Sequence, residues 1–400
     1  MELKLPIGAR IRHYRRRHGN RSLAAVAGLC EVSERYLSMI ENGKRTPSPK
    51  LLTRIAAELD VPVAALLSDE PPPKDPISLT TSPDVARALL GHTPTRARPV
   101  AGPTKLRDRV EDAWRIWQTS PERFSEIERV LPALIEDVEQ SIRAHRGSSD
   151  SVARRDLLRV AADLYGLLRS YCRRSGRLDL SLMVADRALR AAEDADDPIR
   201  IAAAHWNLGH CLLSQVGGAQ EAEEVARVAI KGLGVPGESQ DAAAMKGALE
   251  LVRVVAEAKN NKWWDARQRL QTAAPLGKRV GDSNTMWTVF GPTNIHLHAL
   301  SIEMLAGESA EGLRLADEVD ISRLPSRERQ FTFTLELARC YDLRRDDAAV
   351  FVHLLDLEEL SGEDMARSAP AVDMVAGLLH RVRPTYRRQV SKLAERIGIV

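Results

Sequence analysis

The sequence predicts an all-α protein, and three observations lead to this expectation. Apolar residues recur at helical spacing through most of the 400 residues, as in Leu157, Val160, Leu164 and Leu168. Alternation with a period of two, which is typical of half-buried strands, is nearly absent. Aromatic residues make up only 4% of the chain, and alanine, the best helix former, is abundant. We therefore expect closely packed helices throughout.

The length of the chain and the placement of its prolines predict three regions. Because single cores stop growing near about 250–300 residues, two or more domains are expected. Residues 4–67 have the pattern of a compact unit of short helices. Residues 68–104 contain eight prolines and are expected to form a semi-rigid linker, with one short helix at 84–90. Residues 105–400 are expected to form a long helical domain.

Positive charge is concentrated in the first of these regions. Residues 1–67 carry 12 Lys/Arg and 6 Asp/Glu, a net charge of +6, whereas the remaining 46 Lys/Arg and 49 Asp/Glu give −3. A basic N-terminal domain on a mildly acidic remainder indicates a polyanionic partner for that domain alone.

Five short helices are expected within residues 4–67. The first has an apolar face formed by Ile7, Ile11 and Tyr14. Ser22 and Ser33 have the positions of N-caps for the second and third helices, and glycine after Asn42 ends the third. The expected ranges after the first helix are 22–29, 34–41, 50–59 and 63–67.

Residues 32–48 read Val-Ser-x-x-Tyr-Leu-Ser-x-Ile-Glu-x-Gly-x-Arg-x-Pro-Ser. This run, with the helix at 22–29 before it, resembles the phage-repressor-like, xenobiotic-response-element (XRE) family of helix-turn-helix regulators. The resemblance covers about one-sixth of the chain. It implies a five-helix lambda-repressor-like domain that binds a double-stranded DNA operator as a dimer.

The resemblance also implies particular DNA contacts for the helix at 34–41, which is expected to enter the major groove. An arginine here can donate to guanine O6 and N7, and a glutamate can accept from cytosine N4. The base-reading positions of the family correspond to Glu34, Arg35, Ser38 and Met39. The expected backbone contacts, which position the protein rather than specify sequence, are Arg12, Arg15, Arg16, Arg21, Ser33, Tyr36, Asn42, Lys44 and Arg45.

Two residues depart from the family pattern. Leu23 stands where the family often has a polar base reader, so that contact is not expected. Glu31 replaces the turn glycine, so a slightly different turn conformation is expected.

An internal period is present in residues 105–400. A small residue is followed by gaps of four and three on the second helix of each expected pair. The copies are Ala185/Leu189/Ala192, Ala222/Ala226/Ala229, Ala266/Leu270/Ala273, Gly312/Ala316/Val319 and a weaker Ala348/Val352/Leu355. Residues 205–236 resemble the tetratricopeptide (TPR) consensus, with Leu208-Gly209 on the first helix and small residues on the second. The resemblance implies a TPR-like α-solenoid whose repeats are longer than the usual ~34 residues.

The first helices of TPR pairs line a concave groove that suits an extended peptide or a small amphipathic molecule. Residues 285–400 also resemble C-terminal domains of actinobacterial XRE–TPR regulators. On these resemblances the effector-binding residues are expected to be Trp206, Asn207, His210, Asn294, His298 and Ser301. Alternatively, Trp206, Trp287 and Met304 simply fill the core of the superhelix.

Several classes of function receive no support from the sequence. No apolar run reaches the ~18 residues of a membrane span, and no signal peptide is evident, so we expect a cytoplasmic, nucleoid-associated protein. The four cysteines are isolated, which gives neither a disulfide framework nor a zinc site. His296 and His298 point in different directions on a helix. We therefore expect no metal, no cofactor, no membrane contact and no enzyme activity.

These observations together predict a transcription regulator. The TPR-like domain is expected to form a homodimer, to bind a small-molecule or peptide effector, and to control the spacing of two DNA-binding heads. The alternative is an interaction scaffold, in which the solenoid docks a protein partner and DNA binding only localises it.

Overall fold

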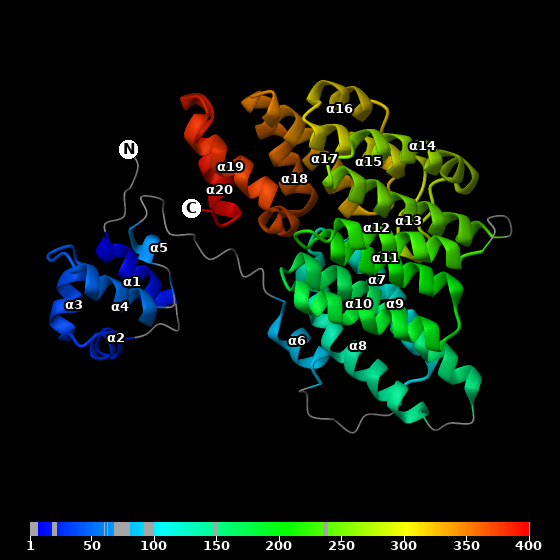
Figure 1. Ribbon diagram of the computed structural model, residues 1–400, viewed down its shortest axis with the longest axis horizontal. Helices are drawn as coiled ribbons and strands as arrows, with labels where there is room; N and C mark the ends of the chain where they lie inside the picture. Colours follow the sequence, from blue (N-terminus) through cyan, green and yellow to red (C-terminus); the bar gives the residue numbers. More distant parts are fainter. Residues whose placement is uncertain are drawn as a thin grey trace. The chain divides into compact units, whose positions relative to one another are not determined.

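The computed structural model describes residues 7–17, 22–59, 61, 63–67, 81–91, 100–146, 150–234 and 239–399. The chain divides into two compact units, Met1–Pro76 and Ile77–Val400, drawn in Figure 1. Within the described ranges all regular structure is helical and no strand occurs, which confirms the all-α expectation. None of the described helices is both long and apolar enough to span a membrane.

The first unit contains five short helices, as expected. They are α1 (Ile7–Arg17), α2 (Leu23–Leu29), α3 (Glu34–Glu41), α4 (Pro49–Glu58) and α5 (Val63–Leu67). The Oγ atoms of Ser22 and Ser33 accept hydrogen bonds from the backbone N–H groups of Ala25 and Tyr36, at 3.1 and 3.2 Å. These bonds satisfy N–H groups that a helix leaves unpaired at its start, so both predicted serine caps are confirmed.

Helices α1 and α3 cross with their backbones in close approach. A Cβ atom on Gly8 would lie 1.9 Å from the carbonyl oxygen of Ile40. The side chains of Ile11, Leu37 and Ile40 are buried beside this crossing. Only glycine therefore fits on α1 at this point, and the crossing fixes α3 against the core.

The turn between α2 and α3 keeps a conformation that favours glycine even though it contains Glu31. The φ angle of Glu31 is 57°, in the left-handed region. Its carboxylate pairs with Arg54 on α4 at 2.6 Å. The replacement of glycine therefore leaves local backbone strain at Glu31.

The second unit begins with a short helix inside the proline-rich stretch, α6 (Pro83–Leu89). Val85 and Leu89 are buried in the core of this unit. The backbone N–H of Ser82 donates to the hydroxyl of Tyr171 at 2.8 Å. Residues 81–91, which the sequence placed in the linker, thus pack on the helical domain.

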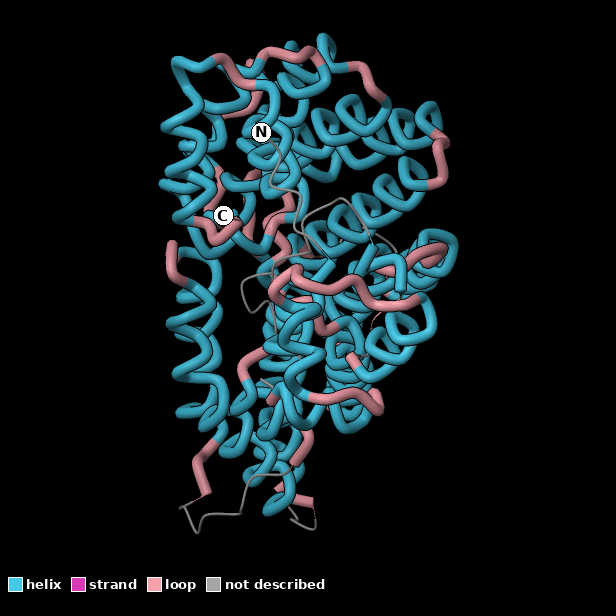
Figure 2. Tube along the Cα trace, turned by 90° about the vertical axis from the view of Figure 1, so that its left-hand side faces the viewer, coloured by secondary structure: helices cyan, strands magenta, loops and turns pink. Residues whose placement is uncertain are grey.

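Two long helices follow, and then five antiparallel helix pairs that lie side by side in sequence order (Figure 1). Figure 2 draws the described residues of this part of the trace as helices joined by loops. The helices are α7 (Pro103–Thr119), α8 (Arg123–His145), α9 (Ser151–Arg174), α10 (Leu178–Asp194), α11 (Pro198–Leu213), α12 (Ala219–Gly232), α13 (Gln240–Lys259), α14 (Trp263–Val280), α15 (Pro292–Ala306), α16 (Ser309–Ala316), α17 (Arg327–Leu343) and α18 (Asp347–Arg367). Two short 3₁₀ helices, η1 (Thr285–Trp287) and η2 (Ile321–Arg323), lie in the loops, and α19 (Ala369–Arg381) and α20 (Pro384–Arg396) end the chain.

The same turn geometry recurs between the two helices of four pairs. A residue with positive φ follows the first helix at Gly176, Asn261, Gly307 and Arg345. After α9, for example, the N–H of Arg177 donates to the carbonyl of Cys172 at 2.9 Å, and after α13 the N–H of Lys262 donates to Glu257 at 2.9 Å. This 6→1 bond is the Schellman helix stop. A repeated turn of one type supports a solenoid of similar units.

The small residues predicted on the second helices lie in the core. Ala185 on α10, Ala222 on α12 and Ala266 on α14 are fully buried. The weaker copy on α18 is wrong, because Val352 is 54% exposed and Leu355 is also exposed. Helix α18 instead buries Val350, Phe351, Leu354 and Leu357, so its packing face is rotated from the predicted one.

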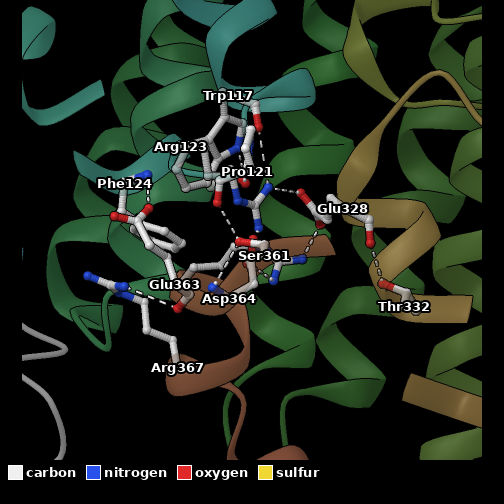
Figure 3. Close-up of polar contacts among 12 residues, drawn as sticks. Trp117, Pro121, Arg123, Phe124, Glu328, Thr332, Ser361, Glu363, Asp364 and Arg367 are labelled. Carbon is white, nitrogen blue, oxygen red and sulfur yellow. Dashed lines mark hydrogen bonds and ion pairs between the residues drawn. The ribbon is translucent and has the colours of Figure 1, made fainter. Parts of the chain in front are cut away.

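The first helices of the second unit contact its last helix pair through Arg123 at the start of α8 (Figure 3). The Arg123 side chain is 2% exposed; it donates to Glu328 of α17 at 3.1 Å and also to Asp364 of α18. Its guanidinium lies 4.3 Å from the ring centre of Trp117. We call Arg123, Glu328 and Asp364 the Arg123 clasp. It joins residues that are 205 and 241 positions apart in the sequence.

Backbone contacts surround the clasp. Ser361 donates through Oγ to the carbonyl of Pro121 at 2.7 Å, and the N–H of Phe124 donates to Glu363 at 2.8 Å. Arg327 donates to the carbonyl of Thr119 at 3.2 Å. Polar contacts therefore join α7 and α8, at the start of the solenoid, to its last repeat pair, α17 and α18.

Replacing Gly8 by alanine is expected to destabilise the first unit by about 1–3 kcal/mol, because the new methyl group must displace the α3 backbone. The matched control is Gly28→Ala, since no atom lies within 4 Å of a Cβ there, and this change should be neutral or slightly stabilising. Hydrogen exchange of the α1 and α3 amides in the full chain measures the difference. Equal protection in the two variants would contradict the proposed crossing.

Arg123→Met is expected to lower the stability of the second unit by about 3–5 kcal/mol, because it leaves the buried carboxylate of Asp364 without its closest cation. Arg115→Met serves as the control, since the Arg115–Asp112 pair is exposed and should contribute about 1 kcal/mol or less. Thermal unfolding of the full chain compares them. A similar melting temperature for both variants would show that the clasp does not hold the solenoid closed.

Candidate nucleic-acid interface and effector cavity

The candidate base-reading residues lie on one face of α3. Glu34 and Arg35 are exposed in its first turn, and Ser38 and Met39 follow them one turn later, half-buried. Because residues three and four apart share a helix face, the four side chains form one strip. Leu37 and Ile40 point into the core instead. This strip is the part of α3 that a major groove would meet.

The loop after α3 adds positive charge beside this strip. Lys44 and Arg45 are exposed. Asn42 ends α3 and donates to the carbonyl of Ser38 at 2.8 Å, while its side-chain oxygen accepts from Arg12 of α1. The hydrogen bond between Arg12 and Asn42 therefore fixes the positions of both side chains at the edge of the strip.

Two further residues that were expected to contact the DNA backbone, Ser33 and Tyr36, have structural roles within the first unit. Ser33 caps α3 with its hydroxyl oxygen, although its side chain remains exposed. Tyr36 is half-buried and packs against the core of the first unit. Leu23 also packs there, in keeping with the absence of a polar reader at that position.

Arg15 is placed inside the first unit rather than on its surface. It is 7% exposed and donates to both carboxylate oxygens of Glu41, at 2.7 and 2.9 Å. These hydrogen bonds raise the pKa of Arg15 above its ordinary value. The burial argues against the expected phosphate contact, and we assign Arg15 to the attachment of α1 to α3.

Two expected contacts fall where the structure gives no side-chain position. Arg16 lies on α1, but its side chain is outside the described part of the chain. Arg21 is outside the described residues altogether.

The second unit contains a cavity of about 110 Å³ between α7, α9, α11, α17 and the loop that holds η1. Four tryptophans contribute to its wall: Trp114, Trp117, Trp206 and Trp287. Trp114 and Trp287 stack with ring centres 4.7 Å apart and planes nearly parallel. The wall is thus largely aromatic.

The charged side chains of the wall are mostly cations. The cations are Arg169, Arg173, Arg174 and Arg329, and the one carboxylate is Glu328. Four positive charges against one negative charge leave a surplus of +3. A partly buried site with such a surplus attracts anions.

The pKa values of these groups reflect the crowding of cations. Burial, with the neighbouring guanidinium groups, lowers the pKa of Arg169 to about 10 and that of Arg173 to about 9. Burial would raise the pKa of Glu328, but Arg174, Arg123 and Arg329 hold it well below its usual range. Arg169, Arg173 and Glu328 are therefore charged at neutral pH.

The two histidines near the cavity are uncharged at neutral pH. Burial is the main cause that lowers the pKa of His298 to about 3 and that of His210 well below its ordinary value, with Arg329 adding to both shifts. His210, which lines the cavity, is therefore a neutral hydrogen-bonding group and does not add to the positive charge.

One wall of the cavity has a strained backbone. Met286, Trp287 and Val289 all have positive φ, between 48° and 57°, and each such residue costs on the order of 1–3 kcal/mol. Gln118 of α7 fixes this segment by donating to the carbonyl of Trp287 at 3.2 Å and accepting from Asn284 at 2.7 Å. Strain of this kind is concentrated at functional sites.

The structure brings some of the expected effector residues together and separates others. Trp206 and His210 line the cavity. Asn207 lines a much smaller adjoining hollow and accepts from Arg169 at 2.7 Å. Asn294 and His298 are buried on α15, outside the cavity wall, and Ser301 donates to Glu336 at 3.3 Å.

The arginines of the cavity were not among the expected effector residues. Arg169 and Arg173 are one turn apart on α9, within a run whose other members are largely buried. That spacing of cations on an otherwise apolar helix was the available signal. Arg329 and Glu328 come from α17, more than 150 residues later, and no local pattern connects them with α9.

Residues 11–66 match the family model described as helix-turn-helix. The first unit is an XRE-type helix-turn-helix domain. Domains of this type belong to DNA-binding regulators. Among curated proteins no match is found. The crystal structure of Bacillus thuringiensis PlcR in complex with the peptide PapR7 and DNA is similar to this chain, with 12% identity and a TM-score of 0.35 over 88% of this chain and 98% of that chain.

The structural role of Arg15 can be tested by comparing its effect on domain stability with that of the exposed Lys44. Arg15→Ala is expected to destabilise the domain by about 3 kcal/mol, because Glu41 then loses its closest buried partner. Lys44→Ala should change stability by no more than about 0.5 kcal/mol. Urea denaturation followed by hydrogen exchange in the full chain distinguishes the two. Unchanged protection of α3 in Arg15→Ala would contradict the structural role.

Proposed function

We propose that the protein is a sequence-specific transcription regulator that binds operator DNA as a homodimer and responds to an effector in its second unit. The observation that carries this proposal is the coexistence in one chain of two features. One is the exposed face of α3 with Glu34 and Arg35, and the other is the cationic, tryptophan-lined cavity.

The proposed dimer follows from how such domains read DNA. One recognition helix reaches only a few base pairs, so helix-turn-helix proteins place two of them about 34 Å apart on successive turns of the major groove. The spacing of two heads is then a property that a sensor domain can set. We assign the self-association to the second unit.

The effector is proposed to act on the closure of the solenoid. Glu328 lines the cavity and also belongs to the Arg123 clasp. A ligand that contacts the arginines beside Glu328 has different affinities for closed and open arrangements of the clasp. Such a difference is what allows a ligand to shift a conformational equilibrium, and head spacing is the proposed readout.

The alternative, a scaffold that docks a protein partner in the solenoid groove, has less support. A docked helix or extended segment requires an open groove. The cavity beside Trp114, Trp117 and the strained loop at Trp287 has a volume of about 110 Å³, too small to hold a helix of about 10 Å diameter. We therefore favour a small effector, or one terminal group of a longer one.

Arg35→Ala is expected to weaken binding to a selected operator by about 5- to 150-fold, corresponding to about 1–3 kcal/mol, because a bidentate base contact is lost. Binding to unrelated DNA should change little. The matched comparison is Lys44→Ala, which should weaken both kinds of DNA alike and reduce the salt dependence. Gel-shift titrations of the full chain at two salt concentrations measure these effects.

Specific binding that is unaffected by Arg35→Ala would contradict the proposed readout. A protein that remains monomeric on its operator would contradict the proposed dimer.

A further inference from the structure

Two of the four cavity arginines are held in place by other side chains. Arg169 donates to Asn207 at 2.7 Å and lies 5.1 Å from the ring centre of Trp206. Arg174 donates to Glu328. These two groups therefore have partners in the structure as it stands.

The side chains of the other two, Arg173 and Arg329, have no hydrogen-bond or ion-pair partner among the described residues. Both are half-buried, and the Nε atom of Arg173 is fully buried without an acceptor. Burial and the neighbouring cations lower the pKa of both groups. An arginine side chain carries five N–H donors and no acceptor. Two guanidinium groups without side-chain partners beside a cavity therefore offer hydrogen-bond donors and positive charge to a bound anion.

The aromatic residues of the cavity wall indicate what kind of molecule bears the anionic group. The rings of Trp114, Trp117, Trp206 and Trp287 line the same space, and Trp114 and Trp287 are stacked on each other. An aromatic ring of a ligand packs well against such a wall in offset or edge-to-face geometry. The volume of about 110 Å³ is below the roughly 300–1,000 Å³ that encloses a drug-sized ligand, so the bound group is small.

We propose that this cavity binds an anionic group, a carboxylate or phosphate attached to a planar ring, with Arg173 and Arg329 as its direct partners. The proposal rests on the proposed function for the role of that ligand as the effector. The strained loop at Met286, Trp287 and Val289 gives the cavity a preorganised wall. A bound anion offsets the electrostatic cost of placing these cations together.

The first test compares ligands that share a phenyl ring and differ in charge, with benzoate and benzamide as the pair of equal shape. Benzoate, phenyl phosphate and neutral benzamide are titrated into the full chain while tryptophan fluorescence and heat are recorded. We expect the two anions to bind and benzamide to bind at least about tenfold more weakly, since charged hydrogen bonds contribute about 1.5–3 kcal/mol each. Equal binding of benzoate and benzamide would overturn the proposal.

The second test uses Arg173→Met and Arg329→Met. Each variant should lose about 10- to 100-fold in benzoate affinity. Each should also melt at a higher temperature than the wild type without ligand, because an unpaired cation is replaced by an apolar chain of similar length. The control is Arg190→Met, since Arg190 is 75% exposed on α10 and should change neither property.

A purely structural role for Arg173 and Arg329 predicts the reverse result. In that case both methionine variants melt lower than the wild type and retain whatever benzoate affinity the wild type has, and the proposal is overturned. The combination of higher melting temperature and lost affinity would support it.

A parallel titration distinguishes the source of the anion. A short peptide ending in phenylalanine is compared with its C-terminal amide. Tighter binding of the free acid than of benzoate indicates a peptide carboxyl terminus, whereas benzoate that binds as well as the peptide indicates a small molecule. Both results support an anion site, and binding of the amide as tightly as the free acid contradicts it.

Failure of these tests is distinguishable from failure of the proposed function. Operator binding and its loss in Arg35→Ala are measured without any ligand. If operator binding is specific but the cavity does not prefer anions, the regulator proposal stands and the anion assignment falls.

Discussion

The buried guanidinium of Arg123 is the contact on which the shape of the second unit depends. It joins α8 to α17 and α18, whose residues are more than 200 positions away in the sequence. A solenoid gains most of its stability from neighbouring repeats, so nothing in the repeats alone requires its ends to meet. The clasp, with Trp117 stacked beside it, adds that long-range constraint.

The cavity is a consequence of this closure. Glu328 takes part in the clasp and also binds Arg174 of α9, so one carboxylate is shared between two guanidinium groups. Too few carboxylates face this space to pair with all its arginines. Such an arrangement is costly for stability, which is why we connect it with ligand binding rather than with folding.

The helix-turn-helix domain uses its arginines in two ways. Arg15 is buried against Glu41 and attaches α1 to α3, while Arg35 stays exposed on the opposite face. Gly8 lets the two helices approach closely. The reading face of α3 is therefore supported by a rigid crossing, as a site that must position side chains against base edges requires.

The amino-acid sequence was sufficient to predict the helical class, the helix-turn-helix domain and the repeating helix pairs. These follow from local rules: serine caps at Ser22 and Ser33, apolar spacing, and small residues where helices cross. It did not determine which face α18 buries, because several apolar residues there satisfy a helical period equally well. The internal position of Arg15 and the cavity shared by Arg173 and Arg329 became evident only from the folded structure. The reason is that burial and charge pairing depend on residues distant in the chain, which no local pattern encodes.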